Sequence, residues 1–449
     1  MAIITSIHTE HLHLNIDMPW NMPTNRITLL TGPNGSGKTQ LLSSTARYLI
    51  STNSLKNNNY LTNVTFTGQL SSVISQTFSP FSRFPSAKRG VQVNSFLSRH
   101  DHEFYTCIGI SQTKTYTART LTRHTLEDAL YRLAESENII FNLFSIIRNL
   151  GYRENFRLKY KGREDLNHFR RIIKTQGISE FEREIRKLGY GHPGSTRSKL
   201  SPSPDYDLLA SAIEISERFQ LSSNNYELDF NLYEKNINDF AAFQSFALLR
   251  RLGLLRLEGF LLFDERNPMP MDVTQTSSGQ QQMLCSMLSL ASALKDNSIV
   301  LIDEPELSLH PTWQYLYIDS LYAVLKQFQG CHILIATHSP LIVQQGAKNG
   351  ADIIQLQNKF HQNILNDDLH IKNHISVEST LLNVFETPVT DSTHLANEIL
   401  SAVVSAEADP SNVANALHTL QNLLKIYSNP IADDRKSIEL IKHAIDCLS

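Results

Sequence analysis

The chain has 449 residues, of which 41% are hydrophobic and 19% are charged, and its formal net charge is −3. This length predicts two or three domains with a large buried core, and the composition is typical of a soluble globular protein. The opening residues, "MAIITSIHTEHLHL", lack the basic start and long apolar run of a signal peptide, and no apolar stretch approaches the length of a membrane span. The four cysteines are scattered singly, which is typical of a reduced cytoplasmic protein.

Residues 1–125 predict the first part of an α/β domain. The stretches "AIITSI" and "HLHLNI" alternate in hydrophobicity, "RITLLT" predicts a buried strand, and "KTQLLSSTARYLI" has the spacing of a helix. Two further strands are predicted at "SSVISQT" and "EFYTCIGI". The chain therefore begins with three strands, a glycine-rich loop and a helix.

The glycine-rich loop, "GPNGSGKT", matches the phosphate-binding pattern GxxxxGK[ST] and lies between a strand and a helix, as that pattern requires. Its glycines let backbone N–H groups close around a phosphate at the positive end of the helix. In such a loop Lys38 pairs with β- and γ-phosphate oxygens, and the Thr39 hydroxyl holds Mg²⁺. The predicted nucleotide-binding residues are Gly32, Pro33, Asn34, Gly35, Ser36, Gly37, Lys38 and Thr39. We therefore expect ATP and Mg²⁺ to bind here.

Residues 126–264 predict a helical insertion, broken by the linker "GYGHPGSTRSKLSPSPD". Its segment 148–199 contains 14 Lys and Arg against 6 Asp and Glu, with Tyr and Phe interleaved. Such a segment is either a DNA-facing surface or the solvated face of amphipathic helices. Both interpretations remain open from the sequence.

The α/β pattern returns over residues 265–357. The stretch "IVLIDEP" places Asp303 and Glu304 at the end of a buried strand, where Asp303 would support Mg²⁺ and Glu304 would activate the attacking water. A helical crossover, "HPTWQYLYIDSLYAVLKQF", leads to the next parallel strand, "HILIATHSP". His338 is therefore expected on the same edge of the sheet as Asp303, where a neutral imidazole can contact the γ-phosphate or the water.

A second glycine-marked helix start lies in "VTQTSSGQQQML". Ser277 is a natural N-cap for the helix that follows, which is a purely structural role. Its hydroxyls and free N–H groups are also suited to bind an anion at the helix N-terminus. The candidate residues of this second phosphate-binding motif are Ser277, Ser278, Gly279 and Gln280.

Along the chain, the phosphate loop, the second glycine-containing motif, the Asp303-Glu304 strand end and His338 follow one another in the order found in ABC-type ATPases. The resemblance covers roughly residues 1–120 and 265–357. The stretch "TSSGQ" resembles the signature motif, with Ser278 where a glycine is more usual. The stretches "DEPELSLHPTWQ" and "ATHSP" resemble the branch of OLD-family, SMC and RecF-like ATPases, and most of all the stand-alone ATPase subunits of antiphage defence systems of the Septu (PtuA-like) kind. His310 stands where transporters carry an aspartate, which argues against a transport engine. The resemblance implies an ATP-sandwich dimer in which Ser278 and Gly279 act on the γ-phosphate held by the second subunit.

The resemblance also implies a glutamine that reaches Mg²⁺ and the water. Gln76, at the end of "SSVISQT", is the candidate for this metal-binding role, and Gln69 and Gln112 are the alternatives. Glutamines on loops are mostly just solvated.

Two other patterns could suggest a metal, and neither is expected to bind one. His8, His11 and His13 are joined by no cysteine or carboxylate pair, and only His11 and His13 should share a strand face. The stretch "RHDHEF" at 99–104 faintly resembles metal phosphohydrolases, but two histidines around one aspartate are a common accident.

Residues 358–449 predict a helical C-terminal domain. OLD-family proteins carry a Toprim nuclease at this place, with an early glutamate and a later DxD pair. The adjacent acids here, Asp367-Asp368 and Asp433-Asp434, lack that spacing. We therefore expect that the chain is not a nuclease and that it controls a separate nuclease subunit, of HNH type, which binds the insertion or the C-terminal domain.

The expected fold is α/β: an ABC-type ATPase head (a mixed sheet with a P-loop) interrupted by a helical insertion, plus a helical C-terminal domain. The expected function is that of a cytoplasmic Mg-ATP-hydrolysing ATPase that dimerises head-to-head and regulates a partner nuclease in an antiphage complex, with DNA as a further ligand and no membrane partner. The alternatives are a RecF/SMC-like clamp for DNA repair or chromosome maintenance and, third, a transporter ATPase.

Overall fold

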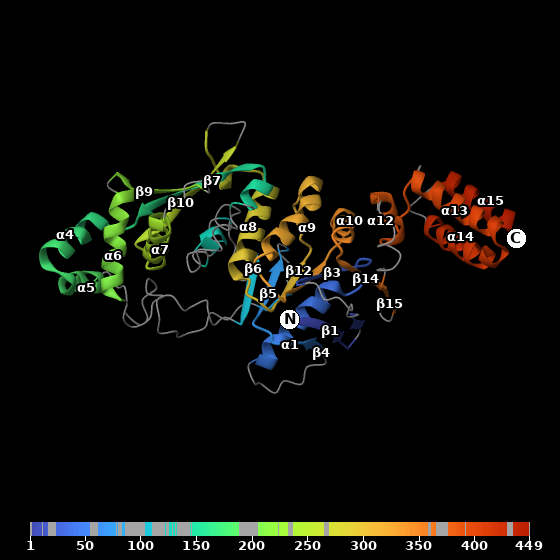
Figure 1. The fold of residues 1–449 in the computed structure, drawn as a ribbon, viewed down its shortest axis with the longest axis horizontal. Coiled ribbons are helices and arrows are strands. Elements are labelled where there is room, and N and C mark those ends of the chain that lie inside the picture. The colour runs from blue at the N-terminus through green and yellow to red at the C-terminus, as the bar shows by residue number, and fades with distance from the viewer. Residues whose placement is uncertain are drawn as a thin grey trace. The chain divides into compact units, whose positions relative to one another are not determined.

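Figure 1 shows the elements of the computed structural model, and the chain divides into two compact units. The first combines Met1–Arg26 with Thr39–Ile335, and the second combines Ile27–Lys38 with Ala336–Ser449. The described residues are 2–10, 12–16, 24–53, 62–77, 79, 83–85, 104–109, 122, 125–127, 129–130, 132, 144, 146–187, 205–222, 224–231, 237–264, 269–357, 361–364, 376–390, 392–428 and 434–448.

An antiparallel sheet opens the first unit. Its central strand β1 (Ile3–His8) pairs with β2 (His13–Asn15) on one side and with β4 (Asn63–Thr67) on the other. Ile7 lies opposite Leu14, and both side chains are fully buried. The alternation of apolar and polar residues thus turns one face of the sheet towards the core, as the sequence predicts.

Four neighbouring strands form the centre of the first unit. In sheet order they are β13 (His332–Ala336), β12 (Ser298–Asp303), β5 (Ser72–Thr77) and β6 (Tyr105–Gly109). β5 pairs in parallel with both β12 and β6, and every residue of β5 and β12 is buried. Continuous burial is typical of parallel strands that are covered on both faces, and it agrees with the apolar run Ile299–Ile302 of β12.

Three helices accompany these strands, namely α1 (Lys38–Asn53), α8 (Ser278–Ala293) and α9 (Pro311–Leu325). α8 packs against β5, β6 and α9, and its side chains from Met283 to Ala291 are all buried. Proline opens α9, where its fixed φ suits the first helical turn and its missing N–H costs no hydrogen bond. These starts agree with the helix positions that the sequence predicts.

The insertion contains an antiparallel sheet as well as helices. In sheet order its strands are β10 (Leu255–Asp264), β7 (Tyr152–Gly162), β9 (Asn225–Asn231) and β8 (Gln220–Ser222), and β11 (Met271–Asp272), which lies beyond residue 264, pairs with β10 at the edge. Its helices are α4 (Leu166–Gln176), α5 (Ile178–Lys187), α6 (Tyr206–Ser216) and α7 (Ile237–Arg251). The prediction of a helical insertion was therefore incomplete.

Aromatic side chains form the core under this sheet. Phe156 on β7 stacks on Phe230 of β9 with ring centroids 4.7 Å apart and meets Phe260 of β10 edge-on at 5.3 Å. Phe243 and Phe246 of α7 cover the same face. Pairs at these distances stabilise a core beyond the area that they bury, so the insertion has a hydrophobic centre of its own.

Mixed strand directions characterise the second unit. β14 (Asp352–Gln357) runs parallel to β3 (Arg26–Thr31) and antiparallel to β15 (His361–Ile364). α10 (Pro340–Lys348) packs on β14, and Gly346 lies so close to Leu29 that an added Cβ would come within 2.4 Å of Leu29 Cδ1. The predicted mixed α/β fold with a P-loop is confirmed.

The second unit ends in helices, as predicted. They are α12 (Val377–Asn383), α13 (Thr393–Ala408), α14 (Val413–Tyr427) and α15 (Arg435–Leu448). The last three helices share a buried cluster that includes Ile399, Leu420 and Ile441. Among the described residues, no helix combines the length and the apolar character needed to cross a membrane.

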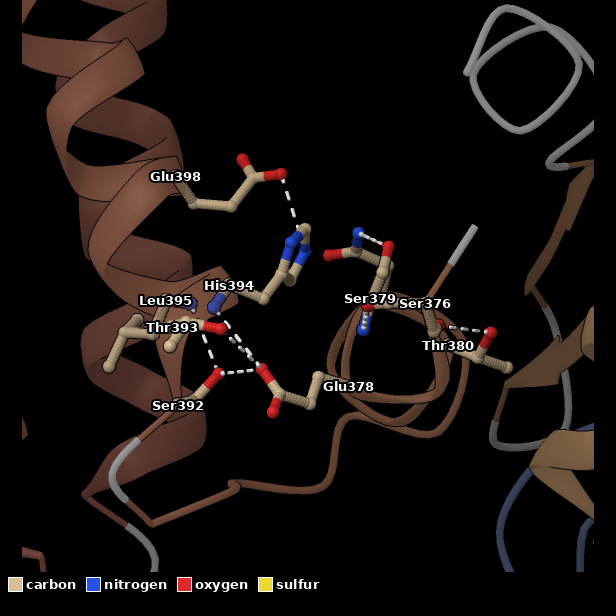
Figure 2. A network of polar contacts seen from close by, with 10 residues as sticks. Ser376, Glu378, Ser379, Thr380, Ser392, Thr393, His394, Leu395 and Glu398 are labelled. Atoms are coloured by element: carbon tan, nitrogen blue, oxygen red, sulfur yellow. Dashed lines mark hydrogen bonds and ion pairs between the residues drawn. The ribbon is translucent and has the colours of Figure 1, made fainter. Parts of the chain in front are cut away.

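A carboxylate joins α12 to α13 (Figure 2). Glu378 accepts hydrogen bonds from the backbone N–H of His394 at 3.2 Å and from the hydroxyls of Ser392 at 3.0 Å and Thr393 at 3.4 Å. These bonds, first the one from His394, lower the pKa of Glu378. An anion at the first turn of a helix also complements the helix dipole, so this contact stabilises the start of α13.

Candidate functional site

The predicted phosphate loop, 32–38, belongs to the second unit and follows β3 directly. Gly32 adopts φ 141°, and a Cβ at this position would lie 2.3 Å from the carbonyl oxygen of Leu356. Gly37 adopts φ 92°, a conformation that residues with a side chain rarely adopt. The glycines of the motif are thus required by the backbone path of the loop.

Lys38 turns its ammonium group back over this loop. Nζ donates to the carbonyl oxygens of Gly32 at 2.9 Å and Pro33 at 3.1 Å and to Ser36 Oγ at 3.2 Å, and the side chain is 5% exposed. A buried cation surrounded by backbone dipoles is an environment in which a phosphate oxygen would be a stronger acceptor than any of these neutral groups. The loop therefore holds its lysine in place for an anion.

In the first unit, the hydroxyl of Thr39 donates to Asp303 Oδ1 at 2.9 Å. Asp303 is the last residue of β12 and is 2% exposed, and Thr39 is half-buried at the start of α1. Two oxygen ligands held together at a helix start fit Mg²⁺, which prefers hard oxygen donors and keeps several waters. Thr39 follows Lys38 directly in the chain, so the candidate metal ligands begin at the residue after the candidate phosphate-binding cation.

Glu304 follows Asp303 in a strained conformation. Its φ is 48°, in the left-handed region that costs a residue with a side chain about 1–2 kcal/mol. A turn holds it there, since the Leu307 N–H donates to the Glu304 carbonyl at 3.3 Å. Strain of this kind persists where the surroundings determine the conformation, and it is concentrated at functional sites. Glu304 is half-buried, and its backbone departs from the extended conformation of β12 directly after Asp303.

His338 lies two residues beyond the end of β13, within the second unit. Burial, followed by the charge of Lys38, lowers the pKa of its imidazole to about 4. The ring is therefore neutral at physiological pH, with one nitrogen that donates a hydrogen bond and one that accepts. The next residue, Ser339, caps α10 by accepting from the Ile342 N–H at 3.2 Å, which fixes the backbone after His338.

The signature-like residues form a complete helix N-cap in the first unit. Ser277 Oγ accepts from the Gln280 N–H at 3.3 Å, and Gln280 Oε1 accepts from the Ser277 N–H at 3.1 Å. Ser277 and Ser278 are exposed, whereas Gly279 is buried against the loop after β12. A Cβ on Gly279 would lie 3.3 Å from the Ser308 carbonyl and 3.4 Å from Trp313 Cδ1. The structural role of Ser277 is thus present, and two exposed serines stand at the positive end of α8.

Gln76, the predicted metal-binding glutamine, is fully buried on β5. Its Nε2 donates to the Ser286 carbonyl on α8 at 3.0 Å, and its Oε1 accepts from the Tyr317 hydroxyl on α9 at 3.3 Å. A metal-binding role would require these hydrogen bonds to be exchanged, and the role stays a prediction. Gln69 is exposed, and Gln112 lies outside the described residues.

The basic segment of the insertion is extensively ion-paired. Its described pairs are Arg148–Glu154, Arg157–Glu227, Arg157–Asp229, Lys159–Glu227, Lys174–Glu217, Arg183–Glu180, Arg186–Glu182 and Lys187–Glu184. Arg170 is 3% exposed and donates to the Ile213 carbonyl at 3.1 Å and the Ser216 hydroxyl at 2.8 Å. These contacts favour the interpretation as a solvated, internally balanced face. DNA binding by this segment stays a prediction.

Two of the three N-terminal histidines are among the described residues. His8 and His13 lie opposite each other on β1 and β2, with their Nδ1 atoms 2.8 Å apart, whereas His11 lies outside the described residues. In the described part of the chain, no group of three or more His, Cys, Asp or Glu could hold a metal. Residues 99–103 of "RHDHEF" also lie outside that part.

Two glutamines of α8 were missed by the sequence reasoning. Gln281 Nε2 donates to the Thr276 carbonyl at 2.8 Å, and its Oε1 accepts from the Thr122 hydroxyl at 3.0 Å. Gln282 contacts the loop that carries Glu304. The run "GQQQ" directly after the signature-like serines was the available signal, because three consecutive amides in the first turns of a helix are unusual for a buried element.

A family match covers these motifs. A model of the family described as "AAA domain, putative AbiEii toxin, Type IV TA system" matches residues 27–344. The match runs from β3 to α10 and spans the phosphate loop, the signature-like residues, Asp303, Glu304 and His338. It covers well over half of the 449 residues.

Two relatives match over short stretches. "Protein ea59" of Escherichia phage lambda is 37% identical over 73 residues, which are 16% of this chain and 14% of the relative. The "Retron Ec83 probable ATPase" of Escherichia coli is 34% identical over 92 residues, which are 18% of this chain and 16% of the relative. The chain thus matches less than one fifth of the length of either relative.

Two solved structures align over most of the chain with low scores. An inward-facing conformation of a "putative metal-chelate type ABC transporter" is 14% identical with a TM-score of 0.32, and the alignment covers 86% of this chain and 90% of that one. UvrA2 from Deinococcus radiodurans is 14% identical with a TM-score of 0.31, covering 81% and 37% respectively. Scores this low support no inference about fold or function.

Proposed function

We propose that this chain, which belongs to the family of AAA domains matched over residues 27–344, binds Mg-ATP at its phosphate loop and hydrolyses it. The observation that carries the proposal is the hydrogen bond from the Thr39 hydroxyl to Asp303 Oδ1 at 2.9 Å. It joins the last residue of the phosphate-binding motif to the acidic end of a buried strand, as a Mg-nucleotide site requires.

Each side chain then has a distinct task. The Lys38 ammonium binds β- and γ-phosphate oxygens, and the oxygens of Thr39 and Asp303 hold Mg²⁺, which when bound offsets the charge that develops on the phosphates. Glu304 accepts a proton from the attacking water, since a carboxylate at a fixed, strained position is a suitable general base. His338, kept neutral by burial and by the charge of Lys38, donates a hydrogen bond to the γ-phosphate.

Dimerisation is part of this proposal. Ser277, Ser278, Gly279 and Gln280 form a second anion-binding helix start, with the two serines exposed. The resemblance of "TSSGQ" to an ABC signature supports a head-to-head dimer in which Ser278 and Gly279 complete the site of the other subunit. Two exposed hydroxyls at a helix N-terminus are suited to a γ-phosphate.

The cellular role that we propose is control of a separate nuclease, of HNH type, in an antiphage complex, most similar to the ATPase subunits of Septu systems. The likeness to the "Retron Ec83 probable ATPase", which spans 18% of this chain, supports an ATPase. The paired acids of the C-terminal domain, Asp367-Asp368 and Asp433-Asp434, lack the DxD spacing, and of these four only Asp434 is among the described residues. The assignment of the nuclease activity to a partner is part of this proposal.

A RecF/SMC-like DNA clamp is the second candidate function, and this function would require DNA as a further ligand. The ion pairs of the insertion weaken this candidate, because cations that are already paired release fewer counterions on binding a phosphate backbone. A transporter ATPase is the third and weakest candidate, since His310 replaces the aspartate usual in transporters.

The experiment that tests the proposal is ATP binding by calorimetry and ATP hydrolysis by phosphate release, in the wild-type chain and in Lys38→Ala. We expect the wild type to bind and hydrolyse ATP and Lys38→Ala to lose both, because the loop loses the cation that faces the β- and γ-phosphates. Lys425→Ala, which removes an exposed lysine from α14, is the matched control and should behave as wild type. Nucleotide affinity in Lys38→Ala that is close to normal would overturn the proposal.

A further inference from the structure

We infer that Gln282 is a positioning residue for Glu304. Its Nε2 donates hydrogen bonds to two backbone carbonyls of the loop after β12, those of Pro305 at 3.2 Å and Leu307. The loop therefore receives both donors of one side-chain amide within three residues of the proposed catalytic base. The inference rests on the proposed ATPase function.

The hydrogen bonds continue from Gln282 to the backbone of Glu304. The Leu307 peptide accepts from Gln282 through its carbonyl, and its N–H donates to the Glu304 carbonyl at 3.3 Å. Two hydrogen bonds thus connect the amide to the residue that holds φ 48°. A left-handed glutamate returns to extended backbone unless its surroundings prevent it. Gln282 supplies that restraint from outside the loop.

A second strained residue lies in the same loop. Ser308 adopts φ 66°, and its carbonyl lies against Gly279 at the start of α8, where a Cβ would come within 3.3 Å of it. The loop is therefore held by α8 at two points, by packing on Gly279 and by the hydrogen bonds of Gln282. The conformation of the loop depends on where the first turns of α8 lie.

This dependence gives the contact a function beyond stability. Ser278 and Gln282 are four residues apart on α8, so they lie on the same face of the helix one turn apart. If Ser278 binds the nucleotide of the second subunit, the position of this helical turn also determines the position of Gln282. The hydrogen bonds of Gln282 then determine the position of the Glu304 loop. A subunit would then place its own general base when its signature-like serine engages its partner, which couples the two sites.

The test uses two substitutions in the full-length chain. Gln282→Met keeps the length of the side chain and removes both donors, and Gln282→Glu keeps the shape but turns a carboxylate towards two carbonyl oxygens. For Gln282→Met we expect kcat to fall about tenfold, while the KM for ATP changes less than about twofold, because nucleotide binding uses other residues. For Gln282→Glu we expect a larger loss of kcat at neutral pH.

The pH profile separates positioning from a general loss of structure. A protonated carboxyl has one O–H donor, whereas a carboxylate has none. The ratio of kcat in Gln282→Glu to that in wild type should therefore rise as pH falls through the pKa of the introduced carboxyl, and the ratio for Gln282→Met should stay flat. A purely destabilising substitution would lose activity at low pH.

Asn25→Ala is the matched control, because Asn25 Nδ2 also donates to two backbone carbonyls, Leu325 at 3.1 Å and Phe328 at 2.7 Å, at the far end of α9. It should keep the wild-type kcat. If wild type hydrolyses ATP but Gln282→Met keeps its kcat, or Asn25→Ala loses as much, the inference about Gln282 is overturned and the ATPase proposal stands. If wild type itself does not hydrolyse ATP, the proposed function fails first.

Discussion

The hydroxyl of Thr39 donates a hydrogen bond to Asp303 Oδ1 at 2.9 Å, although 264 positions separate the two residues in the chain. The first belongs to the turn that starts α1 and the second ends β12. Neither residue needs this contact to complete its own helix or strand. A polar contact between residues so far apart in the chain is expected where both side chains belong to one ligand site.

Removing the hydroxyl should weaken ATP binding only when Mg²⁺ is present. We expect Thr39→Val to lower the affinity for Mg-ATP at least about tenfold and to leave the affinity in EDTA nearly unchanged, because one metal ligand is lost and the phosphate contacts remain. Calorimetry with and without Mg²⁺ measures both values. Thr45→Val is the control, since the Thr45 hydroxyl donates to the Leu41 carbonyl within the same helix at 2.8 Å. Equal losses in both media would contradict the assignment.

Glu304→Gln should retain ATP and stabilise a dimer. The amide has the shape of the carboxylate but cannot accept the proton of the attacking water, so bound ATP persists. Hydrolysis should fall by at least about a hundredfold, in line with the loss of a general base. Light scattering in ATP should then show a doubled mass for the variant. A monomer that holds ATP would argue against the head-to-head arrangement.

A mixture of two inactive variants tests whether the serine acts across the dimer. Lys38→Ala and Ser278→Arg should each be inactive alone, whereas mixed subunits should recover part of the ATPase activity. Each heterodimer keeps one site with an intact Lys38 and an intact Ser278. Subunit exchange is verified with differently tagged chains. Proven heterodimers without activity would point to a site within one chain or to obligatory two-site hydrolysis.

The free energy of unfolding should decrease as the pH is lowered, because of a buried histidine. His332 is fully buried, its Nδ1 accepts from the Ile4 N–H at 3.0 Å, and burial, followed by the charge of Arg26, lowers its pKa to about 3. The unfolded chain takes up this proton near the ordinary value of about 6.5, so stability is lost as pH falls from there towards 3, by at most about 1.4 kcal/mol per pH unit. His332→Asn keeps an acceptor and should show a shallower decline in urea unfolding between pH 6.5 and 4. Parallel curves for the two chains would refute this.

The pure chain should hydrolyse ATP and leave plasmid DNA intact in Mg²⁺ or Mn²⁺. Cleavage of phosphodiesters by two metals needs several converging carboxylates, and the paired acids after "ATHSP" lack that spacing. We expect cleavage only after a partner nuclease is added. Metal-dependent nicking that disappears in a carboxylate variant of the C-terminal region would show that the chain is itself a nuclease.

The local elements of the site follow from the sequence, because each depends on neighbouring residues. The glycines predict the loop, and α1 begins at Lys38, where the motif places it. Ser277 and Gln280 form the N-cap that their spacing indicates. The run of apolar residues before Asp303 predicts β12 for the same reason.

The sheet of the insertion was missed although its signal was present. The alternation of a strand is present, since Phe156, Leu158 and Tyr160 are separated by Arg157 and Lys159. The high charge of the segment is equally typical of amphipathic helices, which were predicted for this segment. The acids that neutralise these cations lie on β9, more than sixty positions away, and no local pattern reveals them. The strained φ of Glu304 and the contact of Gln282 are likewise set by tertiary packing.

The indole of Trp313 lies next to Gly279, since a Cβ added to Gly279 would be 3.4 Å from Trp313 Cδ1. The chain has two tryptophans, and the second is Trp20. In a Trp20→Phe background, the fluorescence of the protein would come from a single half-buried ring beside the signature-like serines and the strained loop. Any rearrangement of that region on nucleotide binding would change the emission of this ring, so the chain contains its own optical reporter, readable by stopped flow without a label.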